Sequence, residues 1–242
     1  MRKQRRGLSA FRLKIIAGVF LSLSVASSTL IPALLGDPHE NFTALTVVVI
    51  CEVVSWSALP IYAWLLVSGF QHTRSVAGYG ARLAVLALGS EIPYDLATYG
   101  TFSFAGQNPV WGLLLALIVL VLVQEIRTRY SGVAGAALIF AVTLLGVLWA
   151  FMCRIGLRQE IMNIGALIII FSLIFYLLEL RENTMMVTAG LIGSLCLVTP
   201  AIGVAFLHYR NETLGYQQAS TQWLFYYVYP IMLLAGVGIT FL

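Results

Sequence analysis

Residues 132–152 read GVAGAALIFAVTLLGVLWAFM, a run without one charged side chain. An α-helix needs about 20 apolar residues to cross the hydrocarbon core of a bilayer. The run therefore predicts a membrane-spanning helix. Such a helix packs against others, and similar apolar runs occur along the rest of the chain.

The whole chain has the composition of a membrane protein. It has 242 residues, of which 60% are hydrophobic and 10% are charged, and its mean hydropathy is +0.92. Soluble domains carry about 25% charged residues, so the composition excludes that class. The net charge of +4 does not indicate nucleic-acid binding, because the basic residues are scattered between the apolar runs. We expect an all-α integral membrane helical bundle in the lipid bilayer.

Eight apolar runs predict about eight transmembrane helices in a single transmembrane domain over residues 1–242, with a short basic segment, 1–12, ahead of them. Pro60 interrupts the second run, which we expect to tilt, to kink or to divide into two pieces. We interpret the first run as a retained span and not as a cleaved signal peptide, because membrane-like sequence follows it. The runs cover residues 13–35, 42–70, 81–99, 109–124, 132–152, 160–180, 185–207 and 223–242.

The charges between the runs orient the bundle. With the N-terminus in the cytoplasm, 11 of the 14 basic residues fall on the cytoplasmic side. Short cytoplasmic loops of membrane proteins carry such an excess of Lys and Arg. We therefore expect a multi-pass protein of the plasma membrane with both termini in the cytoplasm. The three cysteines and three histidines show no spacing typical of metal ligands, so we expect no metal site.

Glu91-Ile92-Pro93-Tyr94-Asp95 places two carboxylates and a proline inside an apolar run. A carboxylate at membrane depth is costly unless it is paired or faces a cavity, which makes Glu91 and Asp95 candidate functional residues. They are four residues apart, so a regular turn places them on one helix face. We expect them beside polar groups of the first or second span. A structural polar cluster and a catalytic or proton-handling role both remain open.

Further polar groups fall inside the first two spans. Glu52 is a second buried acid, which we expect to pair with a basic or hydroxyl group. The first span is rich in hydroxyls, which indicates either packing with local hydrogen bonds or the wall of a polar cavity. The hydroxyl residues are Ser22, Ser24, Ser27, Ser28 and Thr29.

Three motifs in order carry a resemblance to a known family. Residues 59–74 read LPIYAWLLVSGFQHTR, residues 90–95 read SEIPYD, and Gln107-Asn108 precede the next span. This set resembles the TraX family of integral membrane proteins, which is named for the acetylase of F-type conjugative pilin and is similar to the acyltransferase-3 group. The resemblance is specific over residues 59–111 and looser toward both ends.

The resemblance implies an acyltransferase with acetyl-CoA as the donor substrate, and no bound cofactor. On this view His72, Arg74 and Arg82 contact the donor phosphates from the cytoplasmic side. Glu91 or Asp95 is then the catalytic base. Gln107 and Asn108 bind the acceptor, an envelope peptide or glycan; Asn108 alternatively caps the fourth span. Protein partners beyond that acceptor are not indicated.

The chain departs from the family at several positions. Where family members carry Asp-His in the first span, this chain has Ser24-Val25, and Met232 replaces a histidine of the last span. A serine hydroxyl cannot take a proton near neutral pH as an imidazole does. The departures favour a second hypothesis, a non-enzymatic membrane subunit or scaffold that keeps the fold. A small transporter is a third, because intramembrane acids also mark ion paths.

The charge distribution gives a test of the topology. Reporter fusions at Asn183 and at the C-terminus should show cytoplasmic activity, and fusions at Gly106 and Gln217 should show external activity. The physical reason is the excess of basic residues on the first side. A cytoplasmic signal at Gly106 would contradict the arrangement.

Overall fold

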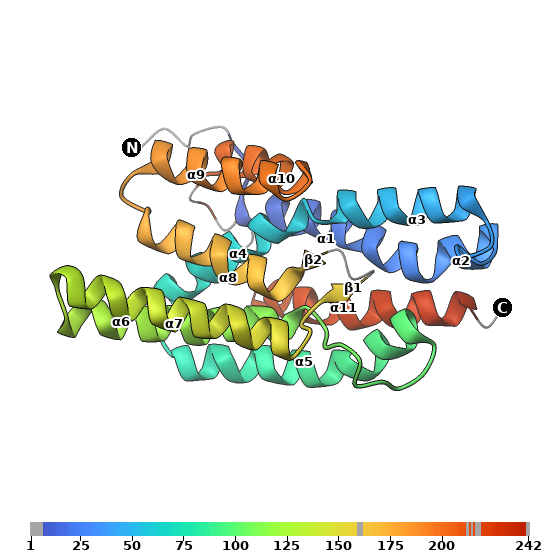
Figure 1. Ribbon diagram of the computed structural model, residues 1–242, viewed down its shortest axis with the longest axis horizontal. Helices are drawn as coiled ribbons and strands as arrows, with labels where there is room; N and C mark the ends of the chain where they lie inside the picture. Colours follow the sequence, from blue (N-terminus) through green and yellow to red (C-terminus); the bar gives the residue numbers. More distant parts are fainter. Residues whose placement is uncertain (1–6, 159–161, 212, 214, 216–218, 241–242) are drawn as a thin grey trace. The chain divides into compact units, whose positions relative to one another are not determined.

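The computed structural model describes residues 7–158, 162–211, 213, 215 and 219–240. It divides the chain into two compact units. The first unit comprises Met1–Tyr62, Pro93–Thr101 and Met186–Leu242, and the second comprises Ala63–Ile92 and Phe102–Met185. The described residues are helical apart from turns, loops and one short hairpin, β1 (Leu157–Arg158) with β2 (Met162–Asn163). The all-α prediction is therefore confirmed (Figure 1).

The first unit is built on α1 and α3, which pack along each other. α2 continues α1 after Thr29, and α11 packs on both α1 and α2. α10 contacts α3. The bounds of these helices are α1 (Ala10–Ser28), α2 (Leu30–Leu35), α3 (Phe42–Ser55), α10 (Thr199–His208) and α11 (Ala219–Thr240).

The second unit is a three-helix core of α6, α7 and α8, each in contact with the other two (Figure 1). Three helices pass from one unit into the other along the chain. These are α4 (Ala58–His72), α5 (Val76–Tyr99) and α9 (Glu182–Leu195). The core helices are α6 (Val110–Arg129), α7 (Gly132–Met152) and α8 (Ile164–Leu177).

Four helical stretches among the described residues are long and apolar enough to cross a membrane. The expected number of eight spans stays a prediction, because several of the remaining apolar helices are shorter. Each of the eight predicted runs nevertheless contains at least one helix among its described residues. The four long stretches are Ala10–Ser28, Phe42–His72, Val110–Arg129 and Gly132–Met152.

Three of the predicted runs are divided into two helices. The first is divided at Thr29. The second is divided at Trp56–Ser57, so Pro60 lies in the first turn of α4, where no intrahelical N–H bond is required. The seventh is divided between α9 and α10, where Leu197 and Val198 have φ angles of 61° and 68° and Pro200 lies in the first turn of the new helix. Proline cannot continue the hydrogen bonding of α9.

Two of these breaks are bonded to each other within the first unit. The Thr199 hydroxyl donates to the Val53 carbonyl at 2.5 Å, and the Ser57 hydroxyl donates to the Thr199 carbonyl at 2.8 Å. Gly203 follows one turn later and contacts the Ser57 carbonyl, an approach that a side chain would block. The two bonds therefore connect the end of α3 to the start of α10 inside the first unit.

The predicted sixth span differs from the structure at its start. The helix α8 begins at Ile164, not at residue 160. Asn163 caps it, because its Oδ1 accepts from the Ala166 N–H at 2.9 Å while its amide donates to the Ala150 carbonyl at 3.0 Å. Residues 159–161 lie outside the described residues. Strand pairing between Arg158 and Met162 takes the place of the expected helical turn.

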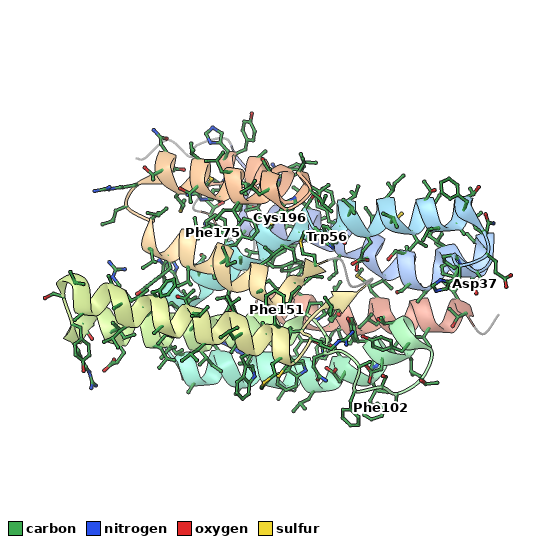
Figure 2. All side chains as sticks on the ribbon, viewed as in Figure 1. Asp37, Trp56, Phe102, Phe151, Phe175 and Cys196 are labelled. Carbon is green, nitrogen blue, oxygen red and sulfur yellow. The ribbon has the colours of Figure 1, made fainter. Side chains whose placement is uncertain are left out.

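Small residues allow the core helices of the second unit to approach closely. A Cβ at Gly112 of α6 would lie 2.8 Å from the Cα of Gly165 in α8, and one at Gly146 of α7 would lie 2.7 Å from Val119. Apolar side chains fill the remaining space: Phe175 is buried here, whereas Phe151 lies on the surface (Figure 2). Close backbone approach of this kind is typical of helices packed in lipid.

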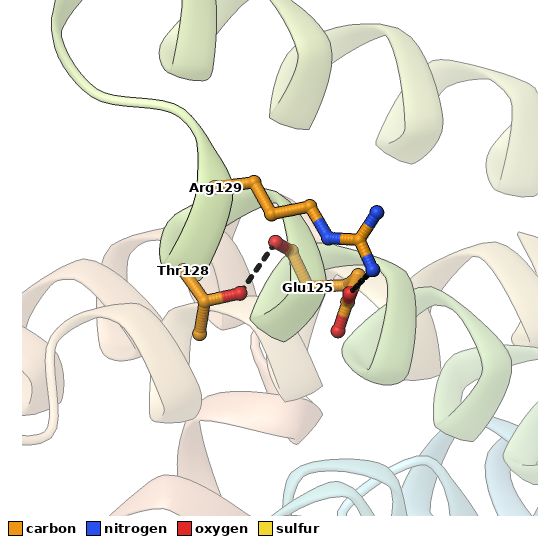
Figure 3. A network of polar contacts seen from close by, with 3 residues as sticks. All are labelled: Glu125, Thr128 and Arg129. Atoms are coloured by element: carbon orange, nitrogen blue, oxygen red, sulfur yellow. Dashed lines mark hydrogen bonds and ion pairs between the residues drawn. The ribbon is translucent and has the colours of Figure 1, made fainter.

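Polar side chains gather at the C-terminal end of α6. Arg129 forms an ion pair with Glu125, and the Thr128 hydroxyl donates to the Glu125 carbonyl at 2.8 Å (Figure 3). Both charged side chains are more than half exposed. The pair contributes little stability, since exposed ion pairs are worth about 0–1 kcal/mol. The position of this exposed ion pair indicates that the C-terminal end of α6 is in contact with water.

The packing of α6 on α8 gives a test with matched substitutions. Gly112→Ala should lower the thermal stability of the purified protein by about 1–3 kcal/mol, because the new methyl overlaps the Gly165 backbone. Gly18→Ala in α1 is the control, because a Cβ there meets no heavy atom within 4 Å, and alanine favours helix by about 0.5–1 kcal/mol. Equal melting temperatures for the two variants would contradict the packing.

Candidate functional site

Glu91 is bonded to the start of α6. Its Oε2 accepts from the Trp111 indole N–H at 2.8 Å, from the Asn108 side-chain amide, and from the Asn108 backbone N–H at 3.5 Å. The side chain is half-buried. Donors of this kind compensate for the water that a carboxylate loses on burial. Its described partners are Trp111 of α6 and Asn108 just before that helix. That Glu91 also lies beside polar groups of the first or second span stays a prediction.

Asn108 holds this arrangement together. It is fully buried. Its amide nitrogen also donates to the Ala87 carbonyl at 2.8 Å, and its Oδ1 accepts from the Val110 N–H at 3.0 Å. The residue therefore ties α5 to α6 and caps α6 with one side chain. All its side-chain polar groups are engaged within the second unit, which explains why an Asn stands there.

Asp95 is fully buried and belongs to the first unit, whereas Glu91 belongs to the second. Both lie on α5, which remains helical through Pro93. The ring of Tyr94, also buried, packs edge-on against Tyr99, with 6.5 Å between ring centroids.

The residues expected to contact the donor lie where α4 ends and α5 begins. His72 closes α4, and its Nδ1 lies 2.8 Å from the Ser68 carbonyl. Arg74 is exposed in the loop that follows. The Arg82 guanidinium lies 5.8 Å from the centroid of the Tyr79 ring, and the Tyr79 hydroxyl reaches within 3.0 Å of a Cβ placed on Gly69. The α4–α5 connection thus gathers three cationic or titratable side chains.

Other helices of the second unit bring charges to the same part of α4. The ring of Tyr176 in α8 lies 5.8 Å from that of Phe70 and 5.6 Å from the Arg127 guanidinium. Gln71 donates to Glu179 at 2.7 Å. Arg127 is a further basic residue at this place, and in the sequence it indicated only the topology. Arg127 therefore adds a positive charge and Glu179 a negative one near the end of α4.

A cavity of about 440 Å³ lies along α6 and α7, and we call it the α6–α7 pocket. Gln107, Arg154 and Trp111 are among the residues that line it. Two hydrogen bonds fix the Gln107 backbone. The Gln107 N–H donates to the Arg154 carbonyl, and the Gly156 N–H donates to the Gln107 carbonyl. Of the two predicted acceptor-binding residues, Gln107 therefore lines a pocket and Asn108 does not. The apolar wall includes Leu114, Leu115, Ile118, Trp149 and Met152.

Glu52 forms a separate polar cluster in the first unit. It is 1% exposed, and its Oε2 accepts from the Ser27 hydroxyl at 2.9 Å and from the Ser24 hydroxyl at 3.1 Å. The predicted pairing with hydroxyl groups is confirmed. Three other hydroxyls of the first run bond to carbonyls of α1: those of Ser22, Ser28 and Thr29.

The positions where the family carries histidines lie at the contact of α1 with α11. A Cβ on Gly236 would lie 2.9 Å from Val25 Cγ1, and Phe225 packs edge-on against Phe11. Phe225, Met232 and Gly236 share one face of α11, at i, i+7 and i+11. Val25 therefore packs against α11 in the first unit, and Ser24 beside it is bonded to Glu52. Met232 is half-buried.

Among the described residues, no group of three or more His, Cys, Asp or Glu could hold a metal ion. The family model described as TraX protein matches residues 31–240 of the chain. No curated protein and no solved structure matches.

The bonds of Glu91 give a second test of stability. Glu91→Gln should keep the melting temperature close to that of the unchanged protein, since the amide oxygen can still accept. Glu91→Leu should lower stability by about 1–3 kcal/mol, because the buried Asn108 amide loses an acceptor. Thermal unfolding in detergent measures both. Glu125→Leu is the control, because the exposed carboxylate of Glu125 is worth at most about 1 kcal/mol.

If Glu91→Leu has the same melting temperature as Glu125→Leu and the unchanged protein, the Glu91 carboxylate does not anchor α5 to α6. If Glu91→Gln is as unstable as Glu91→Leu, the negative charge itself is required.

Proposed function

Because the chain belongs to the TraX family over residues 31–240, we propose that it is a TraX-type membrane acyltransferase. The substrates in this proposal are acetyl-CoA and an amine or hydroxyl group of an envelope peptide or glycan. The observation that carries the proposal is the family match over most of the chain, which includes the motifs at 59–74, 90–95 and 107–108.

The reaction needs a base, an acyl donor and an anion-stabilising group. The acceptor nitrogen or oxygen gives its proton to the base and forms a bond to the thioester carbonyl carbon. The carbonyl oxygen takes the negative charge, then the C–S bond breaks and coenzyme A leaves as a thiolate, which a proton neutralises. Hydrogen-bond donors aimed at the carbonyl oxygen lower the barrier.

We assign the donor phosphates to His72, Arg74 and Arg82. The support for this assignment is their gathering at the connection between α4 and α5, with Arg127 of the same unit adding positive charge. Arg side chains suit phosphate because their N–H groups form a planar fork. In the proposed topology this end faces the cytoplasm, where acetyl-CoA is available.

We assign the base to Glu91 or Asp95, and acceptor binding to Gln107 with Asn108 as its support. The side-chain amide of Gln107 makes no hydrogen bond to the described residues and lines the α6–α7 pocket, so it is available to a ligand. Glu91 lies behind Trp111, to which it is bonded. As a base Glu91 would exchange one of its hydrogen-bond donors for the acceptor.

The second candidate function is a membrane scaffold that keeps the fold without the chemistry. A specific observation favours it: Val25 and Met232 occupy the family's histidine positions and lie on the packed faces of α1 and α11. Ser24 is already bonded to Glu52. Neither position offers an imidazole for proton transfer.

Binding of acetyl-CoA separates the two candidates. The purified protein should bind acetyl-CoA in calorimetry. Arg74→Ala or Arg82→Ala should weaken binding at least about tenfold, because a charge-assisted bond contributes about 1.5–3 kcal/mol. Arg210→Ala, which lies in the first unit and on the predicted external side, should bind as the unchanged protein does.

Mass spectrometry completes the test. Envelope components of a deletion strain should lack one acetyl group that the parent strain carries. No binding at millimolar acetyl-CoA, together with unchanged envelope masses, would favour the scaffold.

A further inference from the structure

The segment that joins α10 to α11 is bonded to the start of α1. The Leu8 N–H donates to the Tyr209 carbonyl at 2.8 Å, and the Asn211 N–H donates to the Leu8 carbonyl at 2.9 Å. The Ala10 N–H donates to the Thr213 carbonyl at 3.0 Å. All these residues belong to the first unit. The two segments therefore lie on the same side of the membrane, since groups on opposite sides are separated by a hydrocarbon core about 30 Å thick.

The helices α1 and α11 run parallel to each other. Near their starts, the ring centroids of Phe11 and Phe225 are 5.7 Å apart. Nearer to their ends, a Cβ on Gly236 would lie 2.9 Å from Val25 Cγ1. If α1 leads out of the cytoplasm, α11 does so too, and Thr240 lies on the side opposite to the start of α1. Such ends require an odd number of crossings, whereas eight spans would return α11 to the first side.

The seventh predicted run has the geometry of a segment that does not cross. It contains α9 with 14 residues and α10 with 10. These helices rise about 21 and 15 Å, less than the hydrocarbon core of about 30 Å. The chain reverses between them: a Cβ on Gly193 would lie 3.0 Å from the Ala201 Cα, although a continuous helix would separate the two residues by about 12 Å. Apolar helices of this length are typical of re-entrant segments.

The turn between α9 and α10 is bonded to the middle of a longer span. The Thr199 hydroxyl donates to the Val53 carbonyl at 2.5 Å, and Val53 lies near the middle of the 31-residue stretch formed by α3 and α4. The N–H groups of Val198 and Thr199 donate to nearby carbonyls. The exposed side chains of the turn, Leu197 and Val198, are apolar. A turn at this depth needs such bonds, because lipid offers the backbone no partner.

The distribution of charges supports the same arrangement. When the seventh run returns to the cytoplasmic side, Arg210 is placed there with it. The cytoplasmic side then carries 12 of the 14 basic residues instead of 11, and Arg154 and Arg158 are the two that remain outside. The excess of Lys and Arg on the cytoplasmic side is therefore stronger than with eight spans. Arg210 stays a control for donor binding, because it belongs to the first unit and the donor residues belong to the second.

We infer that α9 and α10 form a re-entrant hairpin, which enters the membrane from the cytoplasmic side and returns to it, and that α11 then crosses outward. The segment before α11 is cytoplasmic and the end of α11 is external, which reverses both expectations drawn from the charges. The inference does not depend on the acyltransferase assignment, and its tests involve neither donor nor acceptor. It also narrows that assignment, because an external acceptor cannot contact the segment between α10 and α11.

Cysteine labelling of the full chain tests this topology. The three native cysteines are replaced by alanine, and the melting temperature checks that this variant folds. Single cysteines are then introduced by Thr213→Cys or after Leu242 through a short linker, with Asn183→Cys and Gly106→Cys as cytoplasmic and external controls. In intact cells a membrane-impermeant maleimide should label only Gly106→Cys and the appended cysteine. Labelling of Thr213→Cys in intact cells, or protection of the appended cysteine until permeabilisation, would overturn the inference.

An engineered disulfide tests the contact between the two segments in the membrane. Leu8 and Arg210 are partners in a parallel bridge, so Leu8→Cys with Arg210→Cys should form a disulfide on mild oxidation, which mass spectrometry of the joined peptides detects. With eight spans the membrane would separate the two cysteines, and a disulfide requires Cα atoms within about 7 Å.

The control for this disulfide is Leu8→Cys with Gly36→Cys. Gly36 follows α2, at the far end of the first predicted span, so this pair should stay reduced. A folded protein that carries Leu8→Cys and Arg210→Cys but forms no disulfide would contradict the shared side, as would equal oxidation of the control pair.

Discussion

Every polar group inside the apolar helices must find its partner within the protein, because the bilayer core offers none. The first unit meets this constraint where its helices are divided. Thr199 and Ser57 exchange bonds with the carbonyls that the breaks after α3 and α9 expose. Glu52 meets it through Ser24 and Ser27 of the neighbouring helix α1. The polar residues of this unit therefore decide how its helices pair.

The second unit meets the same constraint at the start of α6. Asn108 gives its amide to Glu91 and to the Ala87 carbonyl, and its oxygen to the α6 backbone. One carboxylate and one amide thus fix α5 against α6. The same segment carries Trp111 into the α6–α7 pocket. A motif that resembles a catalytic site is in this way also the structural connection that shapes the neighbouring cavity.

The family membership and the departures from the family have different consequences. The match over residues 31–240 covers the motifs that gather cations at the α4–α5 connection. The departures fall on α1 and α11, where Val25 and Gly236 pack in van der Waals contact. The helix pair α1 and α11 is closely packed at this point.

The sequence by itself determined the helical membrane class, because long uncharged runs such as 132–152 have no other stable state in lipid. It also indicated that the second run tilts, kinks or divides near Pro60, since a proline inside a helix removes a backbone hydrogen bond. Only the tertiary structure decided which polar groups meet. Glu91 bonds to Trp111 of α6 and to Asn108 just before that helix. Glu52 bonds to first-span hydroxyls. The length of the apolar runs predicts which segments are helices. The pairing of single buried polar groups depends on packing between residues far apart in the chain.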